Sequence, residues 1–133
     1  MKTTLNVGAF IEKDGKILLV KKKGKWDLPL SKLDKGVNIL KDLIRDMEKL
    51  TGFVVEPEAV VGIFEDLLEK EQIIRIYFKT KIIGGEQKVG EWFTIKDIQN
   101  MEIEERGRIS SPIDNYRLEK FIPLDFINKF KGV

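Results

Sequence analysis

Side chains that can hold a phosphate group or a metal ion are concentrated between residues 22 and 49 of the chain. Asp46 and Lys49 lie in a segment whose apolar residues recur with helical spacing, and at about 100° per residue they share one flank of the predicted helix with Asp42. The Asp46 carboxylate can ligate a hard divalent cation, whereas the Lys49 ammonium repels such an ion and neutralises phosphate. This flank therefore offers two opposite chemistries side by side.

The residue types available limit which chemistry is open to the chain. Its 133 residues include no histidine and no cysteine, which excludes imidazole bases, thiolate nucleophiles, disulfides and the usual zinc sites. Any reaction must use carboxylates, lysines, hydroxyl groups or a hard metal ion.

Length and charge limit the organisation and the partners. A chain of 133 residues predicts a single domain over residues 1–133. The net charge of +2 gives no large field of one sign, so neither nucleic acid nor a membrane is an expected partner. The N-terminus has no long apolar core, and no apolar run approaches the ~20 residues of a membrane helix, so we expect a cytoplasmic protein.

The helix that carries Asp46 is the element most clearly marked in the sequence. Asn38 predicts its N-cap and Gly52 its end. The apolar residues on one arc, which we expect to face the core, are Ile39, Leu40, Leu43, Ile44, Met47 and Leu50.

The other elements are predicted to be mainly strands. Asp14-Gly15 predicts a hairpin turn, and Lys21 to Lys25 a basic loop. Pro57 predicts a break between two strands, and Thr94 with Asp97 the start of a short helix through Gln99. Strands are predicted over 5–11, 17–20, 53–56, 59–64, 73–83 and 89–93. A later helix is predicted to begin at Ser111-Pro112. A final helical segment carries an apolar face of Phe126, Ile127 and Phe130.

The stretch from Trp26 to Phe53 resembles the Nudix box of nucleoside-diphosphate pyrophosphohydrolases, written G-x5-E-x7-R-E-U-x-E-E-x-G-U with U a bulky apolar residue. The matching residues are Trp26, Leu28 and Pro29 before the box and Arg45, Met47, Gly52 and Phe53 within it. The resemblance implies an α+β fold, a Nudix-like α/β/α sandwich in which helices flank a mixed β-sheet. It also implies divalent ions held by the box glutamates.

The chain departs from the box at the acidic positions that gather those ions. Ser31 replaces the first glycine, and Val37 replaces the first glutamate. Asp46 replaces the glutamate after the arginine, and Lys49 and Leu50 replace the glutamate pair. The formal charge of the four acidic positions falls from −4 to zero, because Asp46 and Lys49 cancel.

Our first hypothesis is therefore a Nudix-like domain whose hydrolase centre is lost. It binds a nucleotide or another phosphorylated ligand through Lys22, Lys23, Lys49 and Ser31, and it needs no cofactor. A solvated hairpin end is the alternative interpretation of the two neighbouring lysines.

Two alternatives remain open at this point. One is an active hydrolase with a rearranged Mg²⁺ site, in which Asp46 and Arg45 are catalytic and Asp46 joins an acid outside the box, such as Glu91 or Glu65, to hold the metal. The other is a protein-interaction module, with a homodimer as the second interpretation of the C-terminal apolar face.

Overall fold

The computed structural model describes residues 1–33 and 38–124. Val37 and the predicted C-terminal apolar face at Phe126, Ile127 and Phe130 lie outside the described residues. Within the described part, no helix has the length and hydrophobicity needed to cross a membrane.

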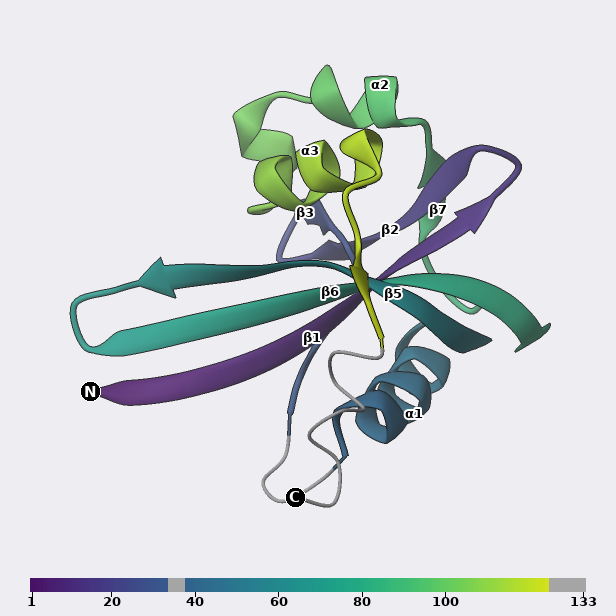
Figure 1. The fold of residues 1–133 in the computed structure, drawn as a ribbon. Coiled ribbons are helices and arrows are strands. Elements are labelled where there is room, and N and C mark those ends of the chain that lie inside the picture. The colour runs from purple at the N-terminus through teal and green to yellow at the C-terminus, as the bar shows by residue number, and fades with distance from the viewer. Residues whose placement is uncertain (34–37, 125–133) are drawn as a thin grey trace.

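One mixed sheet organises the described residues (Figure 1). Its main path runs β3-β2-β1-β6-β5-β8, while β4 pairs with β1 and β7 pairs with β2. The strands are β1 (Lys2–Lys13), β2 (Lys16–Lys22), β3 (Lys25–Asp27), β4 (Leu30–Lys32), β5 (Phe53–Leu67), β6 (Glu71–Gly85), β7 (Glu91–Phe93) and β8 (Ile122–Pro123).

The centre of the sheet is a parallel pair, and the other strand pairs are antiparallel. β1 runs beside β6 from Lys2 opposite Glu71 to Ile11 opposite Thr80. β5 and β6 form a long hairpin on the other side of that pair. The mixed sheet predicted from the resemblance is confirmed.

Two predicted interruptions of strands are wrong. Pro57 does not break β5, because the register shifts between Pro57 and Ala59 and a bulge tolerates a residue without an N–H. The basic segment is not a loop, because Lys23 and Gly24 both have positive φ and turn β2 directly into β3. The hairpin turn at Asp14-Gly15 is confirmed by the positive φ of both residues.

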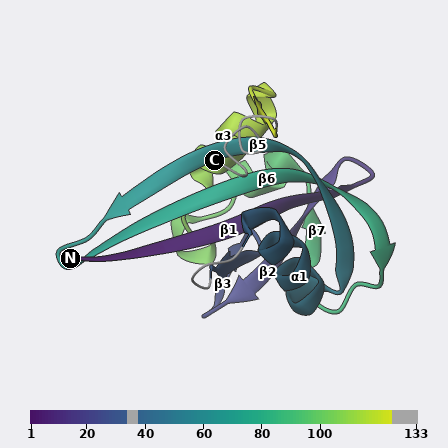
Figure 2. The same ribbon diagram turned by 60° about the horizontal axis from the view of Figure 1, so that its bottom comes forward.

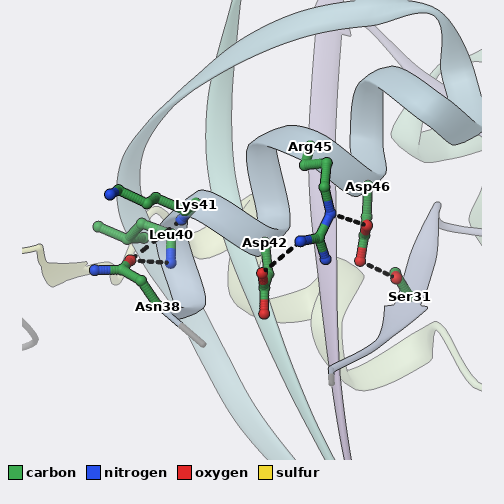
Figure 3. Close-up of polar contacts among 7 residues, drawn as sticks. All are labelled: Ser31, Asn38, Leu40, Lys41, Asp42, Arg45 and Asp46. Carbon is green, nitrogen blue, oxygen red and sulfur yellow. Dashed lines mark hydrogen bonds and ion pairs between the residues drawn. The ribbon is translucent and has the colours of Figure 1, made fainter. Parts of the chain in front are cut away.

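The helix α1 (Ile39–Thr51) has the predicted ends. The Asn38 side-chain oxygen accepts hydrogen bonds from the backbone N–H groups of Leu40 at 3.0 Å and Lys41 at 3.2 Å (Figure 3). Gly52 has φ of 90°, and its N–H donates to the Glu48 carbonyl at 2.8 Å. Both caps are therefore confirmed.

Helices cover both faces of the sheet, as Figures 1 and 2 show. α1 lies on one face, and α2 (Ile95–Gln99) and α3 (Ser110–Leu118) lie on the other. The sheet alternates accordingly: Val7 and Ala9 of β1 pack in the cluster with Leu43 and Met47 of α1, while Phe10 packs in a second cluster toward α2 and α3. The α+β sandwich with flanking helices is confirmed.

The two shorter helices begin close to where the sequence predicts them. Thr94 and Asp97 form the reciprocal capping box that opens α2. α3 begins at Ser110, and Pro112 lies in its first turn, where a missing N–H removes no helical hydrogen bond.

Candidate functional site

Two adjoining cavities lie between α1 and the strands β2, β3 and β4. The first, which we call the polar cavity, measures about 360 Å³ and is lined by Leu30, Ser31, Lys32, Asp46, Lys49 and Leu50. The second, which we call the aliphatic cavity, measures about 260 Å³ and is lined by Val20, Lys21, Lys22, Asp27, Leu28, Leu30, Leu50 and Val89. Leu30 and Leu50 line both, so the two cavities form one cleft.

Two side chains anchor Asp46, which lines the polar cavity (Figure 3). The Ser31 hydroxyl donates to its carboxylate at 2.6 Å, and the Arg45 Nε donates at 3.1 Å. Burial raises the pKa of Asp46, but the bond from Ser31 and the bond and charge of Arg45, with the charge of Lys49, outweigh it, so the pKa lies below 3.8. Asp46 is therefore an ionised carboxylate at neutral pH.

Arg45 bridges two acids of its own helix. Its Nη1 lies 3.1 Å from the Asp42 carboxylate, which is fully buried one turn earlier, while its Nε contacts Asp46 (Figure 3). Because the guanidinium holds the Asp46 carboxylate on the helix surface, Arg45 positions that group.

The strand β4 brings Ser31 to this helix. Its three residues pair with β1, with Val7 opposite Ser31 and Gly8 opposite Leu30. A Cβ at Gly8 would lie 2.7 Å from the buried Tyr77 ring of β6 and 3.0 Å from Leu30, so the Tyr77 ring in particular requires glycine at this position.

Leu50 does not lie in the core, and its predicted burial is wrong. Its side chain is 37% exposed, whereas Leu43 is fully buried. The two residues are seven apart and point in nearly the same direction from the helix. Their different exposure therefore reflects their positions along the helix axis. In the last turn Thr51 is still fully buried, whereas Leu50 lines the cleft.

The predicted site residues are only partly brought together. Ser31, Asp46 and Lys49 line the polar cavity, and Lys22 lines the aliphatic one. Lys23, in the turn between β2 and β3, lines neither cavity.

The predicted second metal ligand does not line the cavity that Asp46 lines. Glu91 is exposed on β7 opposite Leu19 and lines neither cavity. In residues 1–33 and 38–124, no group of three acidic side chains could hold a metal ion. One carboxylate beside an ammonium is a poor ligand set for Mg²⁺, which needs carboxylates or substrate phosphates.

Asp27 is a cleft residue that we did not predict. Burial raises its pKa above 3.8, and a hydrogen bond from the Leu28 N–H at 2.7 Å and the charges of Arg75 and Lys22 offset this only in part. Its second carboxylate oxygen lies against Gly107, where a Cβ would come within 2.5 Å of it. The sequence signal was an acid set between Trp26 and Leu28-Pro29, an otherwise apolar stretch.

Two curated relatives match part of the sequence, and no family model matches it. The chain is 32% identical over 92 residues to a Methanocaldococcus jannaschii protein named ADP-ribose pyrophosphatase, covering 64% of this chain and 54% of that protein. It is 26% identical over 108 residues to putative nudix hydrolase 1 of Caenorhabditis elegans, covering 71% and 29%. The chain thus spans about half the length of the first relative and under a third of the second.

Solved structures share the fold over most of the chain. A NUDIX hydrolase from Nitrosomonas europaea superposes with a TM-score of 0.83 at 24% identity, covering 99% of this chain and all of that one. The MutT protein from Methanosarcina mazei Go1 gives a TM-score of 0.76 at 21% identity, covering 90% and 96%.

Proposed function

We propose that this chain is a member of the Nudix family, which it resembles in sequence and fold, and that its cleft binds a nucleotide or another phosphorylated ligand while the metal-dependent pyrophosphohydrolase centre is largely lost. The observation that carries the proposal is the pair Lys49 and Leu50, which line the polar cavity beside Asp46 where the family motif has two glutamates. A cavity that gathers few carboxylates holds a dication poorly.

The charges around the cleft support an anionic ligand. Its lining residues include four lysines and two aspartates, a net charge of +2. Lys49 lies in the polar cavity, where its ammonium neutralises phosphate charge without activating water. Ser31 already donates its proton to Asp46, so its oxygen can accept a hydrogen bond from a ligand or a water molecule.

A thermal-shift experiment tests this proposal. The protein is heated with a panel of nucleotides, sugar phosphates and inorganic pyrophosphate, once with EDTA and once with Mg²⁺. We expect a stabilising shift in EDTA, because a ligand that binds only the native state stabilises it by about 2.7 kcal/mol at a hundred times its Kd.

Two variants give the experiment its control. Lys49→Gln should lose most of the shift, and Lys41→Gln should keep it, because Lys41 is exposed on the same helix and lines neither cavity. A shift that requires Mg²⁺, or one that Lys49→Gln leaves intact, contradicts the proposal.

An active hydrolase is the second candidate, favoured by the name of the Methanocaldococcus jannaschii relative and by the ionised Asp46. In this version Asp46 holds Mg²⁺ together with an acid such as Glu91, and Arg45 positions Asp46. Formation of AMP and ribose 5-phosphate from ADP-ribose with Mg²⁺, abolished by Asp46→Asn, would establish it. No turnover by the wild-type chain with Mg²⁺ or Mn²⁺ would rule it out for that substrate.

A further inference from the structure

We propose that the ligand of this cleft is the phosphate ester of an aliphatic alcohol, with its phosphate in the polar cavity and its alkyl chain in the aliphatic cavity. This inference rests on the proposed function, because it identifies the class of phosphorylated ligand. It follows from which side chains line the two halves of the cleft.

The aliphatic cavity is lined mainly by branched apolar side chains. Leu28 and Val20 are buried and form its inner wall, and the more exposed Leu50 and Val89 border its opening. Lys21 and Lys22 also line the cavity and are exposed residues, and the methylene stem of a lysine can cover apolar surface while its ammonium group reaches water. Burying an alkyl chain against such a surface removes apolar area from water, which makes binding more favourable.

Within the described residues, no aromatic side chain lines either cavity, so a nucleobase finds no stacking platform there. Trp26, the nearest tryptophan in sequence, packs its ring against Phe93 at 5.1 Å between ring centres. The Lys21 ammonium lies 5.3 Å from the centre of the Trp26 ring. These contacts engage the indole within the protein.

The carboxylate of Asp27 does not make the aliphatic cavity a polar recognition site. One of its oxygens accepts the Leu28 N–H, and the other lies against Gly107. Burial also raises the pKa of Asp27. Both oxygens of Asp27 therefore have a protein neighbour, although the residue lines the cavity.

Leu50 joins the two halves. It lines both cavities, and the polar cavity beyond it carries Lys49 and Lys32. A phosphate near these lysines places an attached alkyl chain directly against the Leu50 side chain. A glutamate at this position would put a charge at the entrance of the aliphatic cavity, so leucine extends the apolar lining to the phosphate end.

Calorimetric titration of the full chain with linear alkyl phosphates of two to six carbons tests the inference, with inorganic pyrophosphate and a nucleoside diphosphate measured in parallel. We expect the affinity to rise about fourfold for each added methylene until the cavity is filled. Leu50→Ser should flatten that rise. Leu118→Ser, at a helix position 49% exposed on the opposite face of the sheet, should leave it unchanged.

The outcomes separate this inference from the proposed function. If pyrophosphate and alkyl phosphates bind in EDTA with an affinity independent of chain length, the cleft still binds phosphate and the aliphatic ligand is wrong. Tighter binding of the nucleoside diphosphate than of any alkyl phosphate also overturns it. If no phosphorylated compound binds, the proposed function itself fails. Linear alkylammonium ions of the same lengths should not bind, since they present the wrong charge to the lysines.

Discussion

Asp27 and Asp46 border the same cleft, yet their surroundings shift their pKa values in opposite directions. Both lose contact with water, which favours the neutral acid. At Asp46 the bonds from Ser31 and Arg45 outweigh this loss, whereas at Asp27 the bond from the Leu28 N–H and the more distant charges do not. The two aspartates should therefore respond oppositely to neutralisation.

We expect Asp46→Asn to be less stable than the wild type at neutral pH, by on the order of 1 kcal/mol, since it weakens charge-assisted hydrogen bonds. The pKa of Asp46 is lowered by folding, so its stabilising contribution is present above pH 3.8 and disappears as the pH falls through the lower, folded-state pKa. Urea unfolding from neutral to acidic pH measures the difference. Asp114→Asn on the exposed face of α3 controls for the lost charge, and a difference unchanged at low pH would contradict the assignment.

Asp27→Asn should instead be more stable than the wild type at neutral pH. The pKa of Asp27 is raised by folding, so the ionised group destabilises the native state above its folded-state pKa. That difference should vanish below pH 3.8, where Asp27 is protonated in both the folded and the unfolded chain. The same urea titration decides it: a destabilised Asp27→Asn at neutral pH would mean that the carboxylate is held by stronger contacts than those described.

Among the elements, the turn after α1 has the strictest backbone requirement. A Cβ on Gly52 would lie 1.9 Å from the Glu86 carbonyl oxygen, and its φ of 90° already disfavours any other residue. Gly15 also has positive φ, at 75°, but has open space around it.

Comparing alanine at these two glycines separates strain from collision. Gly15→Ala should lower the free energy of unfolding by about 1–2 kcal/mol, the cost of a left-handed residue with a Cβ. Gly52→Ala should lose at least a further 1–3 kcal/mol, because the backbone of Glu86 must move. Thermal unfolding of both variants measures the difference, and equal losses would show that the Glu86 segment yields freely.

Periodicity and turn chemistry predict the helices and hairpin turns of this chain because those signals are local. Asn38 and Gly52 bound α1 as expected, and Asp14-Gly15 turns β1 into β2. Pro57 misleads, because whether proline ends a strand depends on the pairing with β6, which sequence spacing does not contain.

The site was less predictable than the fold for the same reason. The arc of α1 shows the direction in which Leu50 points but not where its cover ends. Asp27 was not predicted because its carboxylate lies against Gly107, a residue distant in the chain. The roles assigned to Lys22, Lys23, Lys49, Ser31 and Glu91 stay predictions.

At the scale of the whole molecule, the sheet should exchange its amide hydrogens unevenly. Among the described residues, β6 pairs with β1 on one side and with β5 on the other, whereas β7 pairs only with β2 through three residues. We therefore expect the slowest exchange over residues 73–80 and fast exchange over 91–93, because opening β6 requires separating both neighbours. Hydrogen–deuterium exchange with mass spectrometry measures this order, and comparable rates in the two segments would contradict it.

Exposed apolar side chains on β5 are relevant to the predicted homodimer. In the described part of the chain, β8 pairs with β5 only at Ala59 and Val60, and farther along β5 the side chains of Ile63 and Leu67 are 57% and 65% exposed. A homodimer stays a prediction.

The parallel pairing of β1 with β6 has a consequence for how the chain is made. Thr3 and Gln72 lie opposite each other although 69 residues separate them. During synthesis β1 therefore leaves the ribosome on the order of several seconds before β6 has been made. Meanwhile β1 has only its nearby partners β2 and β4, and one flank stays open. The β5–β6 hairpin, which is local, can form as soon as it emerges and then dock as a unit. The pairing of β1 with β6, at the centre of the sheet, is thus the last to form. In a protein whose sheet is built outward from its first strand, the central pairing would form first.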